Sequence, residues 1–395
     1  MRPPPSDAEA LAPVLDRFAR VRTRVDRARR AVADRAPSPN ETADRLAMFA
    51  EREEIAELRE GPAPRVSADA LDKRERIIGA DDILRISFLG RGMVAARSVG
   101  RVVVAGGLDH GTGFLVAPDI LMTNNHVLPE IAHAAAAEVE FEQHDLTGGF
   151  TGMPTTRLDP GRFWFTDATL DITLVALMEG AATEPLGWHP MIAQQGKIRI
   201  GDPVNIIQHP GGRGKSVVVH NSNLLHLENP ARGRDAQNLG AFLWYDGDTE
   251  KGSSGAPVFN RHWEVVGVHH RGVPRADSAG YLLDAEGKTF SRDELAADPD
   301  RAVWIANEGT RTSRIVAALT EAEFEAARHA RRRDALLELW DESRLHNRGQ
   351  ASARASAADL PAHEGAPGAH GQTGKLRAAG VVIRISIEPE TPSSG

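Results

Sequence analysis

Residues 248–259 read Asp-Thr-Glu-Lys-Gly-Ser-Ser-Gly-Ala-Pro-Val-Phe, a stretch in which small residues surround a serine between two segments rich in β-forming residues. Gly252 and Gly255 allow the backbone to turn tightly where a larger residue would clash. Such a turn can expose the Ser254 hydroxyl and direct backbone N–H groups into the same space, as a nucleophilic serine requires. The alternative interpretation is a surface loop rich in glycine and serine, so the prediction of chemistry depends on two stretches upstream.

These two stretches contain the side chains that would activate the serine. Residues 111–128 predict two strands joined by a Pro-Asp turn and then a polar break that carries His126. Residues 170–177 predict an apolar strand with Asp171 at its head. A serine hydroxyl needs a base to accept its proton, and an imidazole base needs a carboxylate that fixes its tautomer. The α/β-hydrolases are disfavoured because they place serine first, and because Ala256 stands where their G-x-S-x-G motif requires glycine.

The order His, Asp, Ser and the three blocks resemble the chymotrypsin-like serine peptidases, on the bacterial trypsin-like and glutamyl endopeptidase side of that group. The resemblance extends over about residues 98–320. The blocks that carry it are Thr-Asn-Asn-His-Val at 123–127, Leu-Asp-Ile-Thr-Leu at 170–174 and Gly-Ser-Ser-Gly-Ala-Pro-Val-Phe at 252–259.

The resemblance implies a serine endopeptidase that works through an acyl-enzyme and needs no cofactor. It assigns His126 as general base, Asp171 as its orienting partner and Ser254 as nucleophile. It also implies an oxyanion hole made by the N–H groups of Gly252 and Ser254. The alternative is a catalytically silent or latent module that keeps the fold, binds peptides and is recruited by its helical N-terminus. The presence of all three side chains counts against it.

Many short β-rich runs from residue 99 onward predict a mainly β protein. The resemblance implies two antiparallel Greek-key β-barrels, at about 98–180 and 200–320, with the catalytic residues in the cleft between them. Strands are expected at 101–105, 113–116, 120–123, 138–142, 163–165 and 172–177 in the first barrel, and at 204–208, 216–220, 223–227, 242–245, 256–259, 265–269 and 304–306 in the second.

Helical extensions are expected on both sides of the barrels, which divides the chain into regions 1–75, 76–320 and 321–395. Residues 7–35 predict a helix, and a second follows at about 41–60. The apolar stripe of the first helix is formed by Leu11, Val14, Phe18, Val21, Val25, Ala28 and Val32. These helices are interpreted either as a cap packed on the protease domain, or as an inhibitory prosegment or a partner-binding element.

Cleavage after Arg76 would resemble trypsin-type activation, but Ser253 occupies the position where that route needs an aspartate. We therefore interpret the stretch around Arg76 as a short connector between the N-terminal helices and the first barrel. Beyond the barrels, a helix is expected at 314–319, and residues 320–323 predict the cap of a longer helix to about residue 345. Residues 347–375 have the composition of a disordered linker, and 379–387 predict a late strand that could pair with this chain or with a partner.

Substrate preference is expected to depend on side chains near Ser254. In glutamyl endopeptidases, a histidine and a threonine at the positions of His269 and Thr249 bind the substrate carboxylate, which implies a preference for acidic P1 residues. Asp248 falls where trypsin-like enzymes keep the acid that selects arginine or lysine, so acidic, basic and other preferences all stay open. His270 is interpreted as a structural neighbour rather than a second ligand.

The composition narrows the classes of partner, chemistry and cellular location that remain possible. A net charge of −8 argues against nucleic acid as the main partner, and the absence of cysteine excludes disulfides and thiol catalysis. The histidines show no metal-ligand spacing. No apolar run approaches the length of a transmembrane helix, and residues 1–5 lack the apolar core of a signal peptide, so a cytoplasmic protein is expected. The expected partners are a protein or peptide substrate and a protein bound by the N-terminal helices.

Overall fold

The computed structural model describes residues 7–34, 36, 43–59, 84–104, 109–145, 147–227, 239–277, 281–341, 375–378 and 381–384. The chain divides into two units, 1–345 and 346–395. The candidate cleavage site at Arg76 and the expected disordered stretch up to residue 374 lie outside the described residues.

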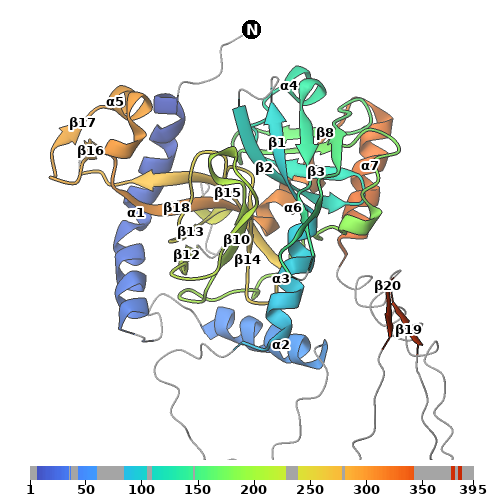
Figure 1. The fold of residues 1–395 in the computed structure, drawn as a ribbon. Coiled ribbons are helices and arrows are strands. Elements are labelled where there is room, and N and C mark those ends of the chain that lie inside the picture. The colour runs from blue at the N-terminus through green and yellow to red at the C-terminus, as the bar shows by residue number, and fades with distance from the viewer. Residues whose placement is uncertain are drawn as a thin grey trace, which may run out of the picture. The chain divides into compact units, whose positions relative to one another are not determined.

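The first sheet of unit 1 is antiparallel and seven-stranded, in the order β7-β4-β1-β2-β3-β9-β8 (Figure 1). An isolated bridge between Leu158 and Leu177 links the chain beyond β7 to the chain beyond β9, so the sheet curls toward a barrel. Its strands are β1 (Val99–Val104), β2 (Asp109–Ala117), β3 (Ile120–Thr123), β4 (Glu138–Glu140), β7 (Thr155–Arg157), β8 (Trp164–Asp167) and β9 (Ile172–Ala176), and a small hairpin of β5 (Gln143–His144) and β6 (Phe150–Gly152) lies between β4 and β7 in the chain.

The second sheet is also antiparallel and seven-stranded, in the order β11-β10-β14-β15-β18-β13-β12. A bridge between Pro203 and Asn223 joins the segments that enter β10 and β12, so this sheet also curls. Its strands are β10 (Asn205–Gln208), β11 (Ser216–Val218), β12 (Leu224–Leu227), β13 (Phe242–Tyr245), β14 (Pro257–Phe259), β15 (Val265–Pro274) and β18 (Trp304–Arg311).

Two of these strands are longer than the sequence predicts. β15 and β18 stay paired from Gly267 opposite Arg311 to Pro274 opposite Trp304, with bulges on the way. The extended ribbon leads to β16 (Leu282–Leu283), β17 (Thr289–Phe290) and α5 (Arg292–Ala297) near one end of helix α1 (Asp7–Ala33) (Figure 1). With these two curled sheets and helices in the N- and C-terminal regions, the predicted mainly β, chymotrypsin-like fold class is confirmed.

The alternation of side chains along the central strands explains how the two sheets pack. In β9, Ile172 and Leu174 point into a cluster shared by both sheets and α1, whereas Val175 points into a separate cluster inside the first sheet. In β13, Phe242 and Trp244 join the shared cluster, and their neighbours join the interior of the second sheet. Because successive side chains on a strand face opposite sides, such strands are buried on both faces.

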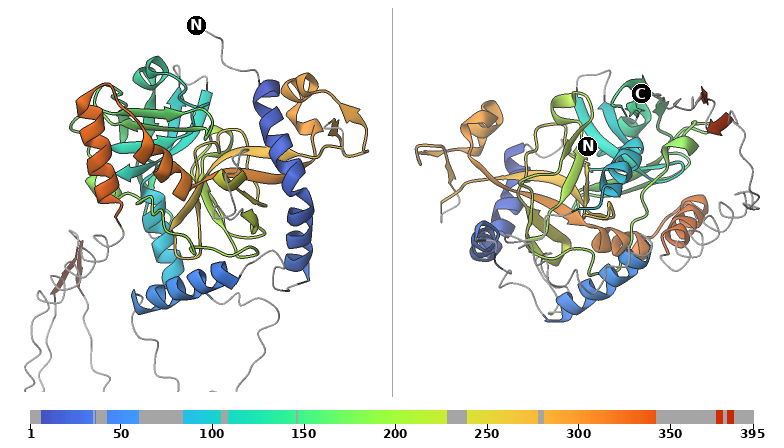
Figure 2. Two further views of the ribbon diagram at one scale, coloured as in Figure 1. Left: turned by 180° about the vertical axis from the view of Figure 1, so that it is seen from behind. Right: turned by 60° about the horizontal axis from the view of Figure 1, so that its bottom comes forward.

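Helix α1 is part of this shared core. The stripe residues Leu11, Val14, Phe18, Val21 and Val25 are all buried and belong to the cluster that includes residues of both sheets. Both views show α1 running along the second sheet (Figures 1 and 2). The apolar face that the sequence offered for a partner is thus covered by the chain's own core. Helix α2 (Ala43–Arg59) follows it.

Three further findings concern the helices. Neither α3 (Ser87–Arg97) nor α4 (Ile131–Ala136) was expected from the sequence. α6 (Thr312–Glu321) corresponds to the helix expected at 314–319. Among the described helices, none combines the length and apolarity needed to cross a bilayer.

The predicted cap of the next helix is wrong. Residues 320–321 end α6, and α7 (Ala327–Leu339) begins later and ends earlier than expected. The chain is extended at Ala322, and Phe324 then packs against Phe163 with ring centroids 5.9 Å apart. Partial burial of the Phe324 ring against the core offsets the loss of helix continuity.

Unit 2 contains a hairpin. β19 (Lys375–Ala378) pairs antiparallel with β20 (Val381–Arg384). The late strand expected at 379–387 is therefore present at 381–384, and its described partner is a segment of the same chain.

Candidate active site

The register of β3 and β9 brings His126 and Asp171 together. Thr123, the last residue of β3, lies opposite Thr173 of β9, so the loop that leaves β3 faces the residue that enters β9. Asp171 accepts two hydrogen bonds from His126: from ring Nδ1 to Oδ2 at 2.7 Å, and from the backbone N–H to Oδ1 at 2.9 Å. The Asn124 amide donates to the Asp171 carbonyl at 2.8 Å, which fixes the backbone on the other side.

The Asp171 backbone has φ +53°, a left-handed conformation that aspartate tolerates better than most residues. Burial by itself raises the pKa of this carboxyl, but the facing His126 and His270 rings more than offset it and hold the pKa well below its ordinary value. An ionised Asp171 keeps the proton of neutral His126 on Nδ1 and leaves Nε2 as an acceptor. The His126 side chain is 35% exposed, so this nitrogen can reach a bound molecule.

Ser254 lies in the turn before β14, and strand β2 holds that turn in place. The Thr112 N–H donates to the Ser254 carbonyl at 2.8 Å, and the Thr112 hydroxyl donates to the Gly252 carbonyl at 2.8 Å. A Cβ added to Gly111 would lie 2.7 Å from Val127 and 3.4 Å from the Ser254 carbonyl. The backbone of Ser254 therefore lies beside the residue that follows His126.

The turn leaves two backbone donors free. Its glycines have positive φ, +94° at Gly252 and +88° at Gly255. The Ser253 N–H donates to Glu250 and the Gly255 N–H donates to His269, but within the described part of the chain the N–H groups of Gly252 and Ser254 have no acceptor. These are the two donors that the sequence assigns to an oxyanion hole.

Residues 111–268 match the family model described as a trypsin-like peptidase domain. The chain carries a trypsin-like peptidase domain. The match begins at the strand that holds the Ser254 turn and ends next to His269, so it includes His126, Asp171 and Ser254. The resemblance to chymotrypsin-like serine peptidases is thereby confirmed.

The peptidase domain has relatives among curated proteins. It is similar to the uncharacterized protein y4fB of Sinorhizobium fredii, with 34% identity over 266 residues that cover 63% of this chain and 40% of the relative. It is also similar to a glutamyl endopeptidase of Staphylococcus aureus, with 22% identity over 237 residues that cover 57% of this chain and 61% of the relative. The chain thus spans less than two thirds of the length of these relatives.

Among solved structures, the chain is similar to the inactive form of the Rv3671c protease of M. tuberculosis, with 16% identity and a TM-score of 0.37 over 60% of this chain and 95% of that chain. A Glu endopeptidase in complex with MPD matches with 15% identity and a TM-score of 0.36, over 55% of this chain and 86% of that chain.

The three side chains expected to select the substrate differ in burial and in hydrogen bonding. His269 is buried, and its Nδ1 lies 2.7 Å from the Tyr245 hydroxyl. The Thr249 hydroxyl donates to the Asn307 side chain at 2.8 Å, so its proton is already engaged. Asp248 is exposed, and its backbone carbonyl accepts a bond from Gln208 at 3.0 Å.

The protonation of His269 follows from burial. Burial lowers the pKa of this ring to about 3, with the neighbouring His270 adding to the effect, so the ring is neutral at physiological pH. Burial also raises the pKa of Tyr245 well above its ordinary value, so the phenol keeps its proton. A buried hydroxyl left without an acceptor is costly, so Tyr245 donates to Nδ1 and the His269 proton resides on Nε2. A neutral His269 therefore presents one N–H donor.

The sequence interpretation missed a second partner of Asp171. His270 is not merely a neighbour of His269: its Nδ1 lies 3.2 Å from Asp171 Oδ2, and its Nε2 lies 2.9 Å from Glu308 Oε1. Glu308 in turn binds Arg17 of α1. The adjacent histidines were the one signal in the sequence. Glu308 and Arg17 lie 38 and 253 residues from His270, farther than any local pattern reaches.

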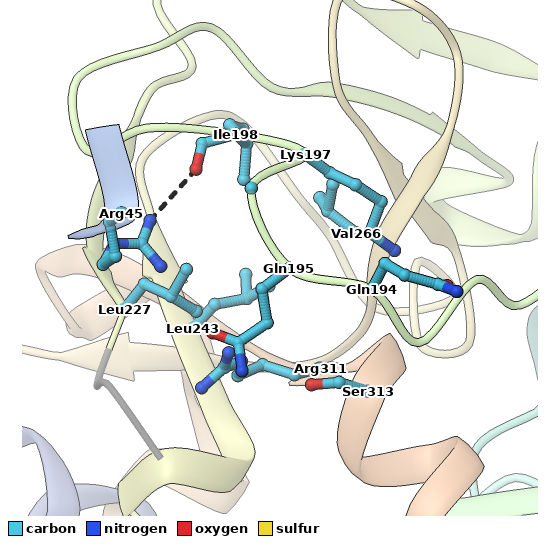
Figure 3. A pocket seen from close by; sticks show the side chains of 11 residues that line it. Arg45, Gln194, Gln195, Lys197, Ile198, Leu227, Leu243, Val266, Arg311 and Ser313 are labelled. Atoms are coloured by element: carbon cyan, nitrogen blue, oxygen red, sulfur yellow. Dashed lines mark hydrogen bonds between the residues drawn. The ribbon is translucent and has the colours of Figure 1, made fainter. Parts of the chain in front are cut away.

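A small cavity of about 30 Å³ lies elsewhere in the domain (Figure 3). It is lined by Arg45 of α2, Arg311 and the 194–198 segment, and includes none of His126, Asp171 or Ser254. The Arg45 guanidinium donates to the Ile198 carbonyl at 3.0 Å, which ties α2 to the segment that precedes β10 (Figure 3). This volume suits a water molecule rather than a peptide side chain. Among the described residues, no group of three or more acidic or histidine side chains is arranged to hold a metal ion.

Proposed function

We propose that this chain is a serine endopeptidase that uses His126, Asp171 and Ser254. The observation that carries the proposal is the two-point attachment of His126 to Asp171 beside the Ser254 turn. Two bonds to one carboxylate fix both the tautomer and the orientation of the imidazole, which a general base needs before it can accept a proton from serine.

The reaction proceeds in two halves. Ser254 Oγ attacks the peptide carbonyl carbon while its proton passes to His126 Nε2, and the Gly252 and Ser254 N–H groups bind the resulting oxyanion. The tetrahedral intermediate collapses, the C–N bond breaks, and His126 gives the proton to the leaving amine. Water then attacks the acyl-enzyme with His126 again as base, which releases the carboxylic acid and restores Ser254.

The competing candidate is a latent or silent peptide-binding module. The observation in its favour is that the Ser254 hydroxyl has no hydrogen bond to His126 or to any other described side chain. Catalytic hydrogen bonds in unliganded enzymes are often long and shorten only when substrate binds, so this separation does not exclude catalysis.

A fluorophosphonate probe distinguishes the two candidates. The probe reacts with an activated serine, and mass spectrometry of the digested protein locates the adduct. We expect an adduct on Ser254 in the full chain and none in Ser254→Ala. Absence of any adduct in the full chain would overturn the peptidase proposal and favour the binding module.

We further propose a preference for acidic P1 residues. The support is the N–H donor that neutral His269 presents, together with the likeness to the glutamyl endopeptidase. Such a donor can bind a carboxylate without carrying a charge of its own. A peptide library with varied P1 residues tests this proposal: cleavage after Glu or Asp supports it, whereas cleavage after Arg or Lys would assign the selecting role to Asp248 instead.

A further inference from the structure

A buried row of charged side chains leads from Asp171 to helix α1. His270 of β15 bridges Asp171 Oδ2 at 3.2 Å and Glu308 Oε1 at 2.9 Å. Arg17 of α1 donates two hydrogen bonds to Glu308 of β18, from Nε to Oε2 at 3.1 Å and from Nη2 to Oε1 at 2.5 Å. The His270 and Glu308 side chains are 4% and 0% exposed, so water does not screen these contacts.

The charges in this row alternate. Each His270 nitrogen faces a carboxylate oxygen, so both nitrogens carry protons and the ring is an imidazolium. Burial by itself lowers the pKa of His270, but Asp171 and Glu308 more than offset it and the pKa lies above its ordinary value. Burial likewise raises the pKa of Glu308, but His270 and Arg17 lower it below its ordinary value. Two anions and two cations thus compensate each other, and removing any one leaves a buried charge unpaired.

The groups around this row come from several elements. His126 lies on the other side of Asp171, and His269 and Arg271 flank His270 on β15. Tyr245 of β13 lies close enough to Glu308 for that carboxylate to raise the pKa of the phenol. Phe242 packs against two members of the row: its ring stacks on His270 with centroids 5.4 Å apart, and the Arg17 guanidinium lies 4.0 Å from its ring centroid.

We propose that His270, Glu308 and Arg17 are positioning residues that hold Asp171 and set how readily His126 takes up a proton. The inference rests on the proposed peptidase function. The His270 cation shares Asp171 Oδ2 with His126, so it competes with the imidazolium that forms on His126 during catalysis. Arg17 keeps Glu308 ionised, and Glu308 helps to keep His270 protonated. Helix α1 therefore contributes a positioning residue to the active site. A change in the contact between Arg17 and Glu308 changes the proton affinity of His126 through the charges of the row.

The test is a titration of His126 by NMR of histidine-labelled protein, in the Ser254→Ala background to prevent self-cleavage. His270→Asn retains a donor toward Asp171 but removes the charge, and Arg17→Gln removes the cation on α1. The first variant removes the positive charge that contacts Asp171, and the second removes the one that pairs with Glu308. In both we expect the pKa of His126 to rise by about half a unit or more, a threefold change in proton affinity. Arg17→Lys should restore the wild-type titration.

The matched control is Arg20→Gln, which makes the same charge change at an exposed position of α1 and should leave the titration unchanged. If Arg17→Gln does not fold, the double variant Arg17→Met with Glu308→Gln removes both outer charges together. Without the Glu308 carboxylate His270 holds its proton less firmly, so the pKa of His126 should again rise. An unchanged His126 titration in the folded variants, or an equal change in Arg20→Gln, would overturn the inference. Since the titration needs no turnover, it is independent of the probe experiment that tests the peptidase proposal itself.

Discussion

At the scale of single residues, this protein depends on groups held in unusual states. Asp171 is ionised although its side chain is only 13% exposed, and it has a left-handed backbone. Neutral His269 lies beside protonated His270. The difference between the two adjacent histidines comes from their partners, a phenol for one and two carboxylates for the other. Environment rather than residue type decides which chemistry each can perform.

The Asp171→Asn variant tests the carboxylate. An asparagine amide would favour the wrong His126 tautomer, so we expect kcat to fall by about four orders of magnitude. KM should change little, because Asp171 lies behind His126 rather than in contact with the substrate. Steady-state kinetics on a cleaved peptide, with circular dichroism to verify folding, measures this. Near wild-type kcat would contradict the assigned role.

The Gly255→Ala variant tests the turn that carries Ser254. An added Cβ would lie 2.0 Å from the Thr112 carbonyl oxygen, and Gly255 has φ +88°. We expect it to destabilise the fold by about 3 kcal/mol or more, through clash and backbone strain together. Gly180→Ala is the matched control, because Gly180 has φ +82° but nothing within 4 Å of its Cβ position. It should lose only about 1 kcal/mol in urea denaturation. Equal losses would show that the contact with Thr112 is unimportant.

At the scale of secondary-structure elements, α1 is the helix whose role the sequence left open. The apolar stripe of α1 could be recognised in the sequence. Whether it packs against this chain or against a partner depends on which surface lies opposite the helix. In the structure, the stripe packs on the second sheet and on the core that the two sheets share. Removing the helix would therefore expose core residues, so truncation alone cannot separate inhibition from structural support.

The Phe18→Ala variant measures how firmly α1 is docked. Phe18 is 4% exposed within the shared core. We expect the variant to lose about 3–5 kcal/mol of unfolding free energy, in one transition for α1 and the sheets together. Leu46→Ala on α2, where the side chain is 44% exposed, should lose less than about 1 kcal/mol. A separate early transition in hydrogen exchange, confined to α1, would mean that the helix is a detachable cap.

At the scale of the whole molecule, the site exists because two sheets meet. The first sheet positions His126 and Asp171, and its strand β2 also holds the Ser254 turn of the second sheet through Thr112. Several histidines are buried in this packing. Burial lowers the pKa of His189 and His209 to about 4 and that of His269 to about 3, against an ordinary value of 6.5.

These histidines predict acid lability. The folded chain binds their protons more weakly than the unfolded chain, so their contribution to stability is complete above pH 6.5 and is lost as pH falls toward about 4. At pH 5 each should cost about 2 kcal/mol. His270, whose pKa is raised, opposes this trend because its contribution is present at low pH and lost as pH rises.

Urea denaturation at pH 7.5 and pH 5 tests the prediction. We expect the lower midpoint at pH 5, and a smaller difference between the two pH values for His189→Gln, which removes one of the titrating rings. An equal or higher midpoint at pH 5 would show that these groups are not held neutral by burial.

The fold class, most strand positions and the residues proposed for catalysis could be predicted from the sequence, because apolar alternation and glycine-serine turns are patterns of a few adjacent residues. The start of α7 could not be predicted, because Phe324 packs partly buried against Phe163, which is distant in the sequence. Tertiary structure alone decided that His270 contacts Asp171 and, through Glu308, Arg17, which is 291 residues away from Glu308 in the chain. Charge pairing of this kind depends on distance in space and on exclusion of water, and neither leaves a local pattern in the sequence.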